Sequence, residues 1–111
     1  MQERPPLRDK LYYSISEVAD HFQVAQSVLR YWESEFNELK PKRNSKGTRF
    51  YTKENIETID LIYHLVKIRG YTIPGARSEL KNNRSALRKR QRAIAQLQKL
   101  RSFLLDLREK I

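Results

Sequence analysis

The first pattern of apolar and polar positions along the chain predicts two short helices joined by a tight turn between Ser14 and Glu35. Ser14 and Glu17 have the spacing of a capping box, in which each side chain accepts from a backbone N–H of the other residue. At about 100° per residue, one side of the second helix is apolar and carries Val28, Leu29, Trp32 and Phe36. The opposite side is polar and carries Gln26, Ser27, Arg30, Tyr31 and Ser34. This arrangement predicts a helix-turn-helix with one packing face and one exposed face.

The residue types on the polar face suit the major groove of duplex DNA. Gln can pair with adenine, Arg can pair with guanine, and small hydroxyls can bond phosphate or either base. We therefore predict Gln26, Ser27, Arg30 and Tyr31 as the DNA-reading residues. Two amphipathic helices around an apolar corner also occur in small domains that never touch DNA, so this pattern alone leaves both interpretations open.

A two-stranded hairpin is predicted after the second helix, with its turn at Asn44–Gly47 and strand-like residues at Thr48–Tyr51. Gly47 can adopt the positive φ that a short turn requires. Residues 40–53 carry six basic side chains and no acidic one, whereas a solvated surface normally mixes both signs. Such a wing can lay a cationic tip on the DNA backbone or in the minor groove, and Lys46 and Arg49 lie nearest that tip. The alternative is a solubilising loop.

A longer amphipathic helix is predicted from a cap at Thr52 to a stop at Gly70. Its apolar residues recur at helical spacing and mark it as the centre of the core: Ile56, Ile59, Ile62, Tyr63 and Val66. A second short helix is predicted to begin at Thr72, with Pro74 tolerated in its first turn. The polar residues 81–84 then break the pattern.

Residues 85–111 contain neither Gly nor Pro and predict one helix of roughly 40 Å at about 1.5 Å per residue. Apolar residues repeat there in alternating steps of three and four and define a seam: Leu97, Leu100, Leu104, Leu107 and Ile111. This is the spacing of a coiled coil, and the alternative is packing on the chain's own domain. Residues 85–101 also form a second block with six basic side chains and no acidic one, a second candidate for phosphate contact.

Composition narrows the class of protein. The 111 residues allow one domain and an extension, with too little chain for a large enzyme cleft. No cysteine is available for a disulfide or a thiolate metal site, and we expect no cofactor, no metal and no enzymatic activity. The sequence has neither a membrane-length apolar run nor a signal peptide, which predicts a cytoplasmic, nucleoid-associated protein. The net charge of +10 indicates an anionic partner.

From Ser14 to about Leu80 the sequence resembles the DNA-binding domain of MerR-family transcription regulators. The resemblance is carried by ISEVA, by V..S.LRYWE, by G.R.Y followed by T..NI, and by G.TI..A...L. Two positions depart from the family pattern. Gln23 stands where a turn glycine is usual, and Ala25 stands where a capping Ser or Thr is usual. An Ala cap costs about 1 kcal/mol, so the turn geometry is the part of the fold that these departures affect.

The resemblance implies further properties. It implies that Arg49 contacts the DNA backbone and that the C-terminal helices of two chains pair as an antiparallel coiled coil. It also implies binding at promoters whose two elements are spaced too far apart, with bending and untwisting of the duplex to realign them, and adds RNA polymerase as a candidate partner.

Tyr13, just before the first helix, could reach a phosphate or pack against the helix as a staple. No sensor domain follows the coil in this sequence, so we expect a regulator without one.

We therefore predict a mainly α fold, a winged helix-turn-helix with a small β-hairpin wing followed by a long C-terminal coiled-coil helix. The predicted parts are a loose tail over 1–10, a DNA-binding domain over 11–84 and a dimerisation helix over 85–111. The predicted function is sequence-specific binding of double-stranded DNA by a homodimer that regulates transcription from a two-fold operator. The alternatives are an architectural or excisionase-like recombination protein and a small basic RNA-associated protein.

Overall fold

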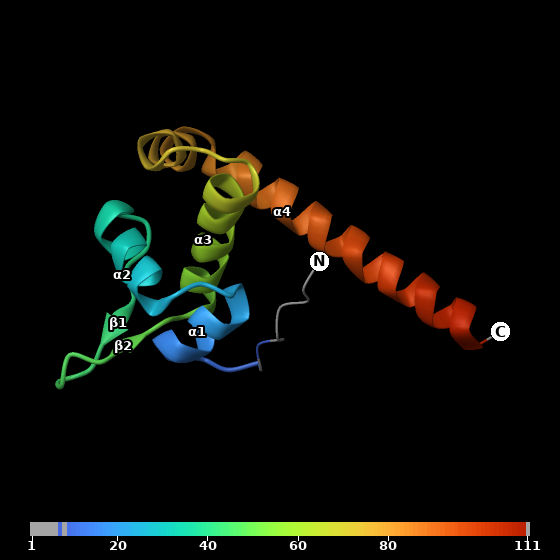
Figure 1. Ribbon diagram of the computed structural model, residues 1–111, viewed down its shortest axis with the longest axis horizontal. Helices are drawn as coiled ribbons and strands as arrows, with labels where there is room; N and C mark the ends of the chain where they lie inside the picture. Colours follow the sequence, from blue (N-terminus) through green and yellow to red (C-terminus); the bar gives the residue numbers. More distant parts are fainter. Residues whose placement is uncertain (1–6, 8, 111) are drawn as a thin grey trace. The chain divides into compact units, whose positions relative to one another are not determined.

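The chain is mainly helical, with one small hairpin, in a computed structural model that describes residue 7 and residues 9–110 (Figure 1). In chain order the elements are α1 (Ile15–Phe22), α2 (Gln26–Glu35), β1 (Lys42–Arg43), β2 (Arg49–Phe50), α3 (Lys53–Tyr63), η1 (His64–Ile68) and α4 (Ile73–Lys110). The chain divides into two compact units between Arg77 and Ser78. The predicted fold class is confirmed, with its helix-turn-helix, its hairpin and its long C-terminal helix. Ile111 and most of the predicted tail over 1–10 lie outside the described residues.

The helix-turn-helix is formed by α1 and α2. The predicted capping box is present, because Glu17 N donates to Ser14 Oγ at 3.1 Å and Ser14 N donates to Glu17 Oε1 at 3.2 Å. Gln23 ends α1 in the left-handed region, with φ 55° and ψ 47°, which L residues other than Asn and Asp seldom adopt. Ala25 caps α2 without a side-chain hydrogen bond. Both departures from the family pattern therefore have local structural consequences, and the turn still forms.

The core of the first unit lies where α1, α2 and α3 meet. Its largest buried side chains come from all of these elements and from the segments between them: Phe22, Leu29, Trp32, Phe36, Leu39, Tyr51, Ile59 and Ile62. Thr52 caps α3 as predicted, because Asn55 N donates to Thr52 Oγ1. Thr52 N also donates to Asn55 Oδ1, which completes a second capping box that was not predicted from the sequence. Asn55 Nδ2 also donates to the backbone oxygen of Lys40 at 3.3 Å, which ties the start of α3 to the segment entering the hairpin.

The wing is the hairpin of β1 and β2 with its turn at residues 44–48. Its strands are antiparallel and place Arg43 opposite Arg49. Asn44 organises the turn, since its side-chain oxygen accepts from the backbone N–H groups of Lys46 and Thr48 at 2.9 and 3.0 Å. Gly47 adopts the positive φ expected of it, 78°. The turn chemistry therefore holds the tip of the wing in a defined shape.

The helix predicted to run to Gly70 is α-helical only as far as Tyr63. It continues as the π-helix η1, where Arg69 N donates to the backbone oxygen of His64 across five residues. Gly70 then takes φ 73° and ends the segment at the predicted residue.

In α4, Asn83 is the residue with non-helical backbone angles, φ −130° and ψ 26°. The predicted polar break at residues 81–84 therefore corresponds to a kink at Asn83, which separates the two helical parts of α4. Every described residue from Ala95 onward is exposed, including the leucines of the predicted seam. Leu97, Leu100, Leu104 and Leu107 have exposed fractions of 66%, 54%, 54% and 42%.

Candidate nucleic-acid interface

The two faces of α2 separate as predicted. Leu29 and Trp32 are buried and Val28 is half-buried, whereas Ser27, Arg30 and Tyr31 are exposed and Gln26 is partly exposed. The outward face therefore presents side chains that can donate to and accept from base edges.

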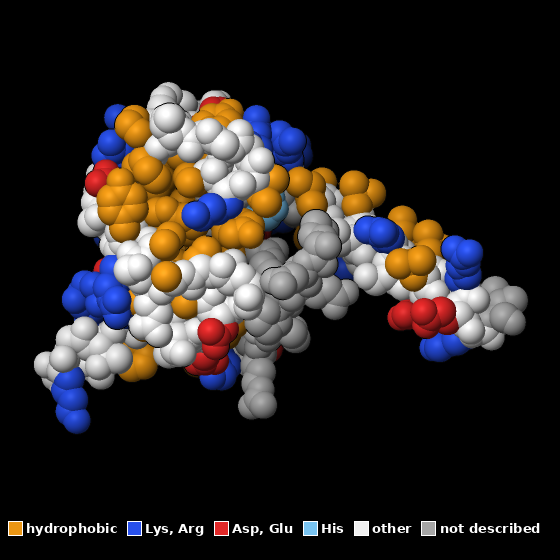
Figure 2. Space-filling model, viewed as in Figure 1, with side chains coloured by type: hydrophobic (Ala, Val, Ile, Leu, Met, Phe, Trp, Pro, Cys, Tyr) orange, Lys and Arg blue, Asp and Glu red, His pale blue; other side chains and the backbone are white. Residues whose placement is uncertain are grey.

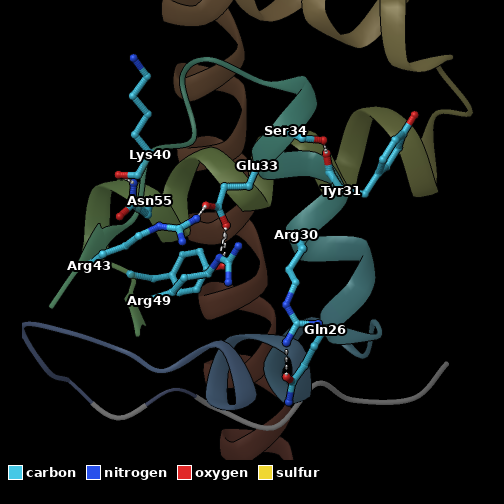
Figure 3. Close-up of polar contacts among 10 residues, drawn as sticks. Gln26, Arg30, Tyr31, Glu33, Ser34, Lys40, Arg43, Arg49 and Asn55 are labelled. Atoms are coloured by element: carbon cyan, nitrogen blue, oxygen red, sulfur yellow. Dashed lines mark hydrogen bonds and ion pairs between the residues drawn. The ribbon is translucent and has the colours of Figure 1, made fainter. Parts of the chain in front are cut away.

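Arg30 and Gln26 contact each other on this face, because Arg30 Nη2 donates to Gln26 Oε1 at 3.3 Å (Figure 3). The two side chains are four residues apart and lie on one side of the helix. The contact is long and exposed, so a base edge could replace it at little cost. It aligns the guanidinium and the amide along the helix in the unbound protein.

The wing supplies the positive charge. Lys46 is exposed in the turn, and a basic side chain marks the tip of the hairpin in Figure 2. The backbone N–H of Lys46 is bonded to Asn44, so the charge is carried on an ordered turn. This geometry is compatible with the phosphate contact predicted for Lys46, which stays a prediction.

The wing arginines are engaged within the protein. Arg49 Nε donates to Glu33 Oε2 at 2.7 Å, and Arg43 Nη2 donates to Glu33 Oε1 at 3.1 Å (Figure 3). Tyr51 Oη donates to Glu33 Oε2 at 3.4 Å. Residues 40–53 contain no acidic residue, but in the folded chain Glu33 of α2 lies against them and supplies a negative charge. A DNA contact was predicted from the sequence for Arg49, whereas no role was assigned to Arg43 or Glu33.

Tyr51 and Tyr13 tie the end of the wing to the core. Their backbones form a bridge, with Tyr13 N donating to Tyr51 O and Tyr51 N to Tyr13 O, both at 2.8 Å. Burial, assisted by the negative charge of Glu33, raises the pKa of Tyr51 to about 12. Tyr13 is only 4% exposed, and its hydroxyl accepts from Lys10 N at 3.0 Å. Of the two roles considered for Tyr13, this burial favours packing over phosphate contact.

Only the first half of the second basic block lies together on α4, where Arg88, Lys89 and Arg92, with Arg84 and Ser85, line a hollow of about 600 Å³. Among the described residues no cluster of three or more His, Asp or Glu side chains could hold a metal ion. No helix within the described part of the chain is both long and apolar enough to cross a membrane.

Comparison with known proteins identifies the family. The model of the MerR HTH family of regulatory proteins matches residues 13–83. No curated protein sequence matches the chain significantly.

Solved structures agree with this match. A MerR-family transcriptional regulator from Bacillus cereus is 25% identical, with a TM-score of 0.58 over 89% of this chain and 79% of that one. One from Bacillus thuringiensis is also 25% identical, with a TM-score of 0.52 over 90% and 96%. HiNmlR, a MerR-family regulator lacking the sensor domain and bound to promoter DNA, shares the fold at 16% identity, with a TM-score of 0.54 over 89% and 86%. The chain belongs to the MerR HTH family, whose fold is that of a DNA-binding transcription regulator.

Proposed function

We propose that this protein is a homodimer that binds promoter DNA sequence-specifically and regulates transcription. The observation that carries the proposal is the placement of the polar face of α2 beside a basic, ordered wing. A helix of this kind fits the major groove, and a cationic hairpin beside it can contact the adjacent backbone. HiNmlR, which has this fold and lacks the sensor domain, is bound to promoter DNA in its structure, and that supports the same partner here.

In this proposal Gln26, Ser27, Arg30 and Tyr31 face the groove. The Arg30–Gln26 hydrogen bond of the unbound protein is exchanged for bonds to bases, with Arg30 donating to a guanine and Gln26 pairing with an adenine. Lys46 contacts a phosphate from the tip of the wing. Phosphate contacts set register and affinity, while the base contacts on α2 set the sequence.

The dimer is proposed from the exposed leucines of α4. Leu97, Leu100, Leu104 and Leu107 keep the three- and four-residue steps of a coiled-coil seam and are all exposed in the single chain. A contiguous apolar stripe of this kind is typical of a surface that another protein covers. A second copy of α4, antiparallel as in the family, would bury it.

Such a dimer would present two identical α2 helices, so its operator would be an inverted repeat. On straight DNA the half-sites would be an integral number of turns apart, at about 34 to 36 Å per turn. By resemblance to the family, we propose that the dimer bends and untwists the promoter for RNA polymerase. Elastic distortion costs of order 1 to 6 kcal/mol, so affinity would depend on central base pairs that no side chain touches.

Selection of bound fragments from genomic DNA tests the function. Enrichment of promoter fragments that share an inverted repeat is the expected result. Enrichment at the ends of mobile elements would replace regulation with a recombination role, and failure to enrich any duplex would overturn the proposal. A circular-permutation gel assay tests the distortion, and the bound duplex should migrate anomalously in it. If the bound duplex is straight and affinity does not depend on the central base pairs, the protein does not distort DNA and would regulate only by occluding the promoter.

Sedimentation tests the dimer. The wild-type protein should sediment as a dimer at micromolar concentration, and the double variant Leu100→Glu, Leu104→Glu should be a monomer because two charges enter the seam. Ser102→Glu is the matched control, since Ser102 lies on the opposite side of the same helical turns. A monomeric wild type, or a dimer that survives the double substitution, would contradict the proposed seam.

A further inference from the structure

One carboxylate joins the helix predicted to read DNA to both strands of the wing. Glu33 lies on α2, Arg43 on β1 and Arg49 on β2. The two guanidiniums bond separate oxygens of Glu33, Arg43 Nη2 to Oε1 at 3.1 Å and Arg49 Nε to Oε2 at 2.7 Å. Figure 3 shows both contacts converging on the Glu33 side chain. The carboxylate therefore fixes the wing at two points.

The burial of the three side chains differs in an informative way. Their exposed fractions are 13% for Glu33, 24% for Arg49 and 50% for Arg43. The carboxylate is the least accessible partner, while its guanidiniums retain surface that a phosphate could reach. Hydrogen bonds between charged groups are short and about twice as strong as neutral ones, so this cluster is stronger than an exposed ion pair.

Glu33 also lies close to the predicted base-reading residues. It follows Gln26 by seven residues and Arg30 by three, spacings that place all three on one side of a helix. The charges of Glu33 and Arg30 both act on the buried hydroxyl of Tyr51: Glu33 raises the pKa of Tyr51, and Arg30 lowers it. The carboxylate that holds the wing therefore lies on the same side of α2 as the residues that would enter the groove.

We propose that Glu33 is a positioning residue that makes the phosphate contacts of Arg43 and Arg49 depend on correct docking of α2. It does so by holding both guanidiniums in one orientation and cancelling part of their charge. On a nonspecific duplex α2 is not docked in the groove, and the guanidiniums that Glu33 holds lie within reach of few phosphates. On the operator, docking of α2 places phosphates within reach of both guanidiniums. Glu33 thereby raises the ratio of specific to nonspecific affinity, a role that rests on the proposed DNA-binding function.

The test is the nearly isosteric change Glu33→Gln, with affinity for operator and for random duplex measured over a range of salt. Releasing a guanidinium to a phosphate should steepen the log–log salt slope on random duplex by about 0.9, which raises that affinity about eightfold at 0.1 M salt relative to 1 M. Operator affinity should not rise, so the specificity ratio falls by a similar factor. Glu57→Gln on the exposed side of α3 changes net charge equally and should leave the ratio unchanged.

Three results would overturn the role. Equal gains on both duplexes would mean that Glu33 only repels DNA, equal losses at an unchanged slope would mean that it only stabilises the fold, and no change would mean that it does neither. Adding Arg49→Gln to Glu33→Gln should return the slope on random duplex toward the wild-type value. A wild-type protein that binds no duplex would refute the proposed function itself, which keeps the two failures distinct.

A variant that leaves no unpaired charge covers the case in which Glu33→Gln does not fold. Changing Glu33, Arg43 and Arg49 together to Gln removes the carboxylate and both guanidiniums. This triple variant should bind random duplex with a slope no steeper than wild type, and its specificity ratio should still fall because the wing is no longer held. Retention of the full ratio would contradict positioning by Glu33.

Discussion

The ionisation of Tyr51 gives a direct test of the geometry beneath the wing. The side chain is fully buried, and its hydroxyl donates to Glu33 Oε2 at 3.4 Å. Burial and the adjacent carboxylate raise the pKa of Tyr51 from its ordinary value of 10.0 to about 12. Between these values the folded chain keeps the phenolic proton and the unfolded chain loses it. Stability must therefore fall as the pH rises from 10 to 12.

The size of the effect follows from linkage. One unit of pKa shift corresponds to about 1.4 kcal/mol, so the shift of Tyr51 removes about 2 to 3 kcal/mol of unfolding free energy by pH 12. This loss is a large part of the total free energy of unfolding of a small domain, which is about 5 to 15 kcal/mol. Urea unfolding at closely spaced pH values, followed by far-ultraviolet circular dichroism, measures the loss as a decrease in the midpoint concentration.

Tyr51→Phe is the matched control, because it keeps the buried ring and removes the ionisable hydroxyl. The difference in unfolding free energy between wild type and variant should shift by about 2 to 3 kcal/mol between pH 10 and pH 12. Lys53 also contributes in this range, since its contact with Asp9 raises the pKa of Lys53, but it does so in both proteins. If both proteins lose stability in parallel, the Tyr51 hydroxyl is not buried against Glu33, and the geometry described beneath the wing is wrong.

Three further predictions concern single side chains of the DNA-binding unit. Ala25→Ser should raise the unfolding free energy by about 1 kcal/mol and slow amide exchange in the first turn of α2, because it supplies the missing cap; unchanged exchange would contradict this. Arg30→Ala should weaken operator binding by about 1 to 3 kcal/mol and relax preference at one base pair, whereas an equal decrease on all sequences would make Arg30 a phosphate-binding residue. Lys46→Ala should flatten the salt dependence by about 0.9 in log–log slope for each phosphate that the wing tip no longer neutralises, and an unchanged slope would place the tip off the DNA.

The parts of the fold that depend on neighbouring residues could be predicted from the sequence. The capping box at Ser14 and Glu17, the turn glycine Gly47 and the stop at Gly70 each require only a few residues with known preferences. The packing face of α2 follows from helical periodicity, and Leu29 and Trp32 are buried as expected. Local chemistry of this kind can be read along the chain without knowledge of the tertiary structure.

Contacts between distant parts of the chain could not be predicted in the same way. Glu33 is separated from Arg43 and Arg49 by 10 and 16 residues. No periodicity joins a helix to a hairpin, and the pairing depends on the angle at which the wing leaves the core. For the same reason, the basic block looked free of acid when counted along the sequence. The hydrogen bond from Asn55 to the backbone of Lys40 was missed on the same grounds.

Helix α2 is held unequally along its length. Its first turn follows Gln23 in a left-handed conformation and Ala25 without a side-chain cap, two features that each cost on the order of 1 kcal/mol. Its last turns are held by the buried Trp32 and by the contacts of Glu33 with the wing. Gln26 lies at the loosely held end and Arg30 between the two. A helix held in this way can adjust its first turn to the bases while the wing keeps a fixed position. The first turn of α2 would then set which base changes the protein tolerates, and the last turns would set its register on the DNA backbone.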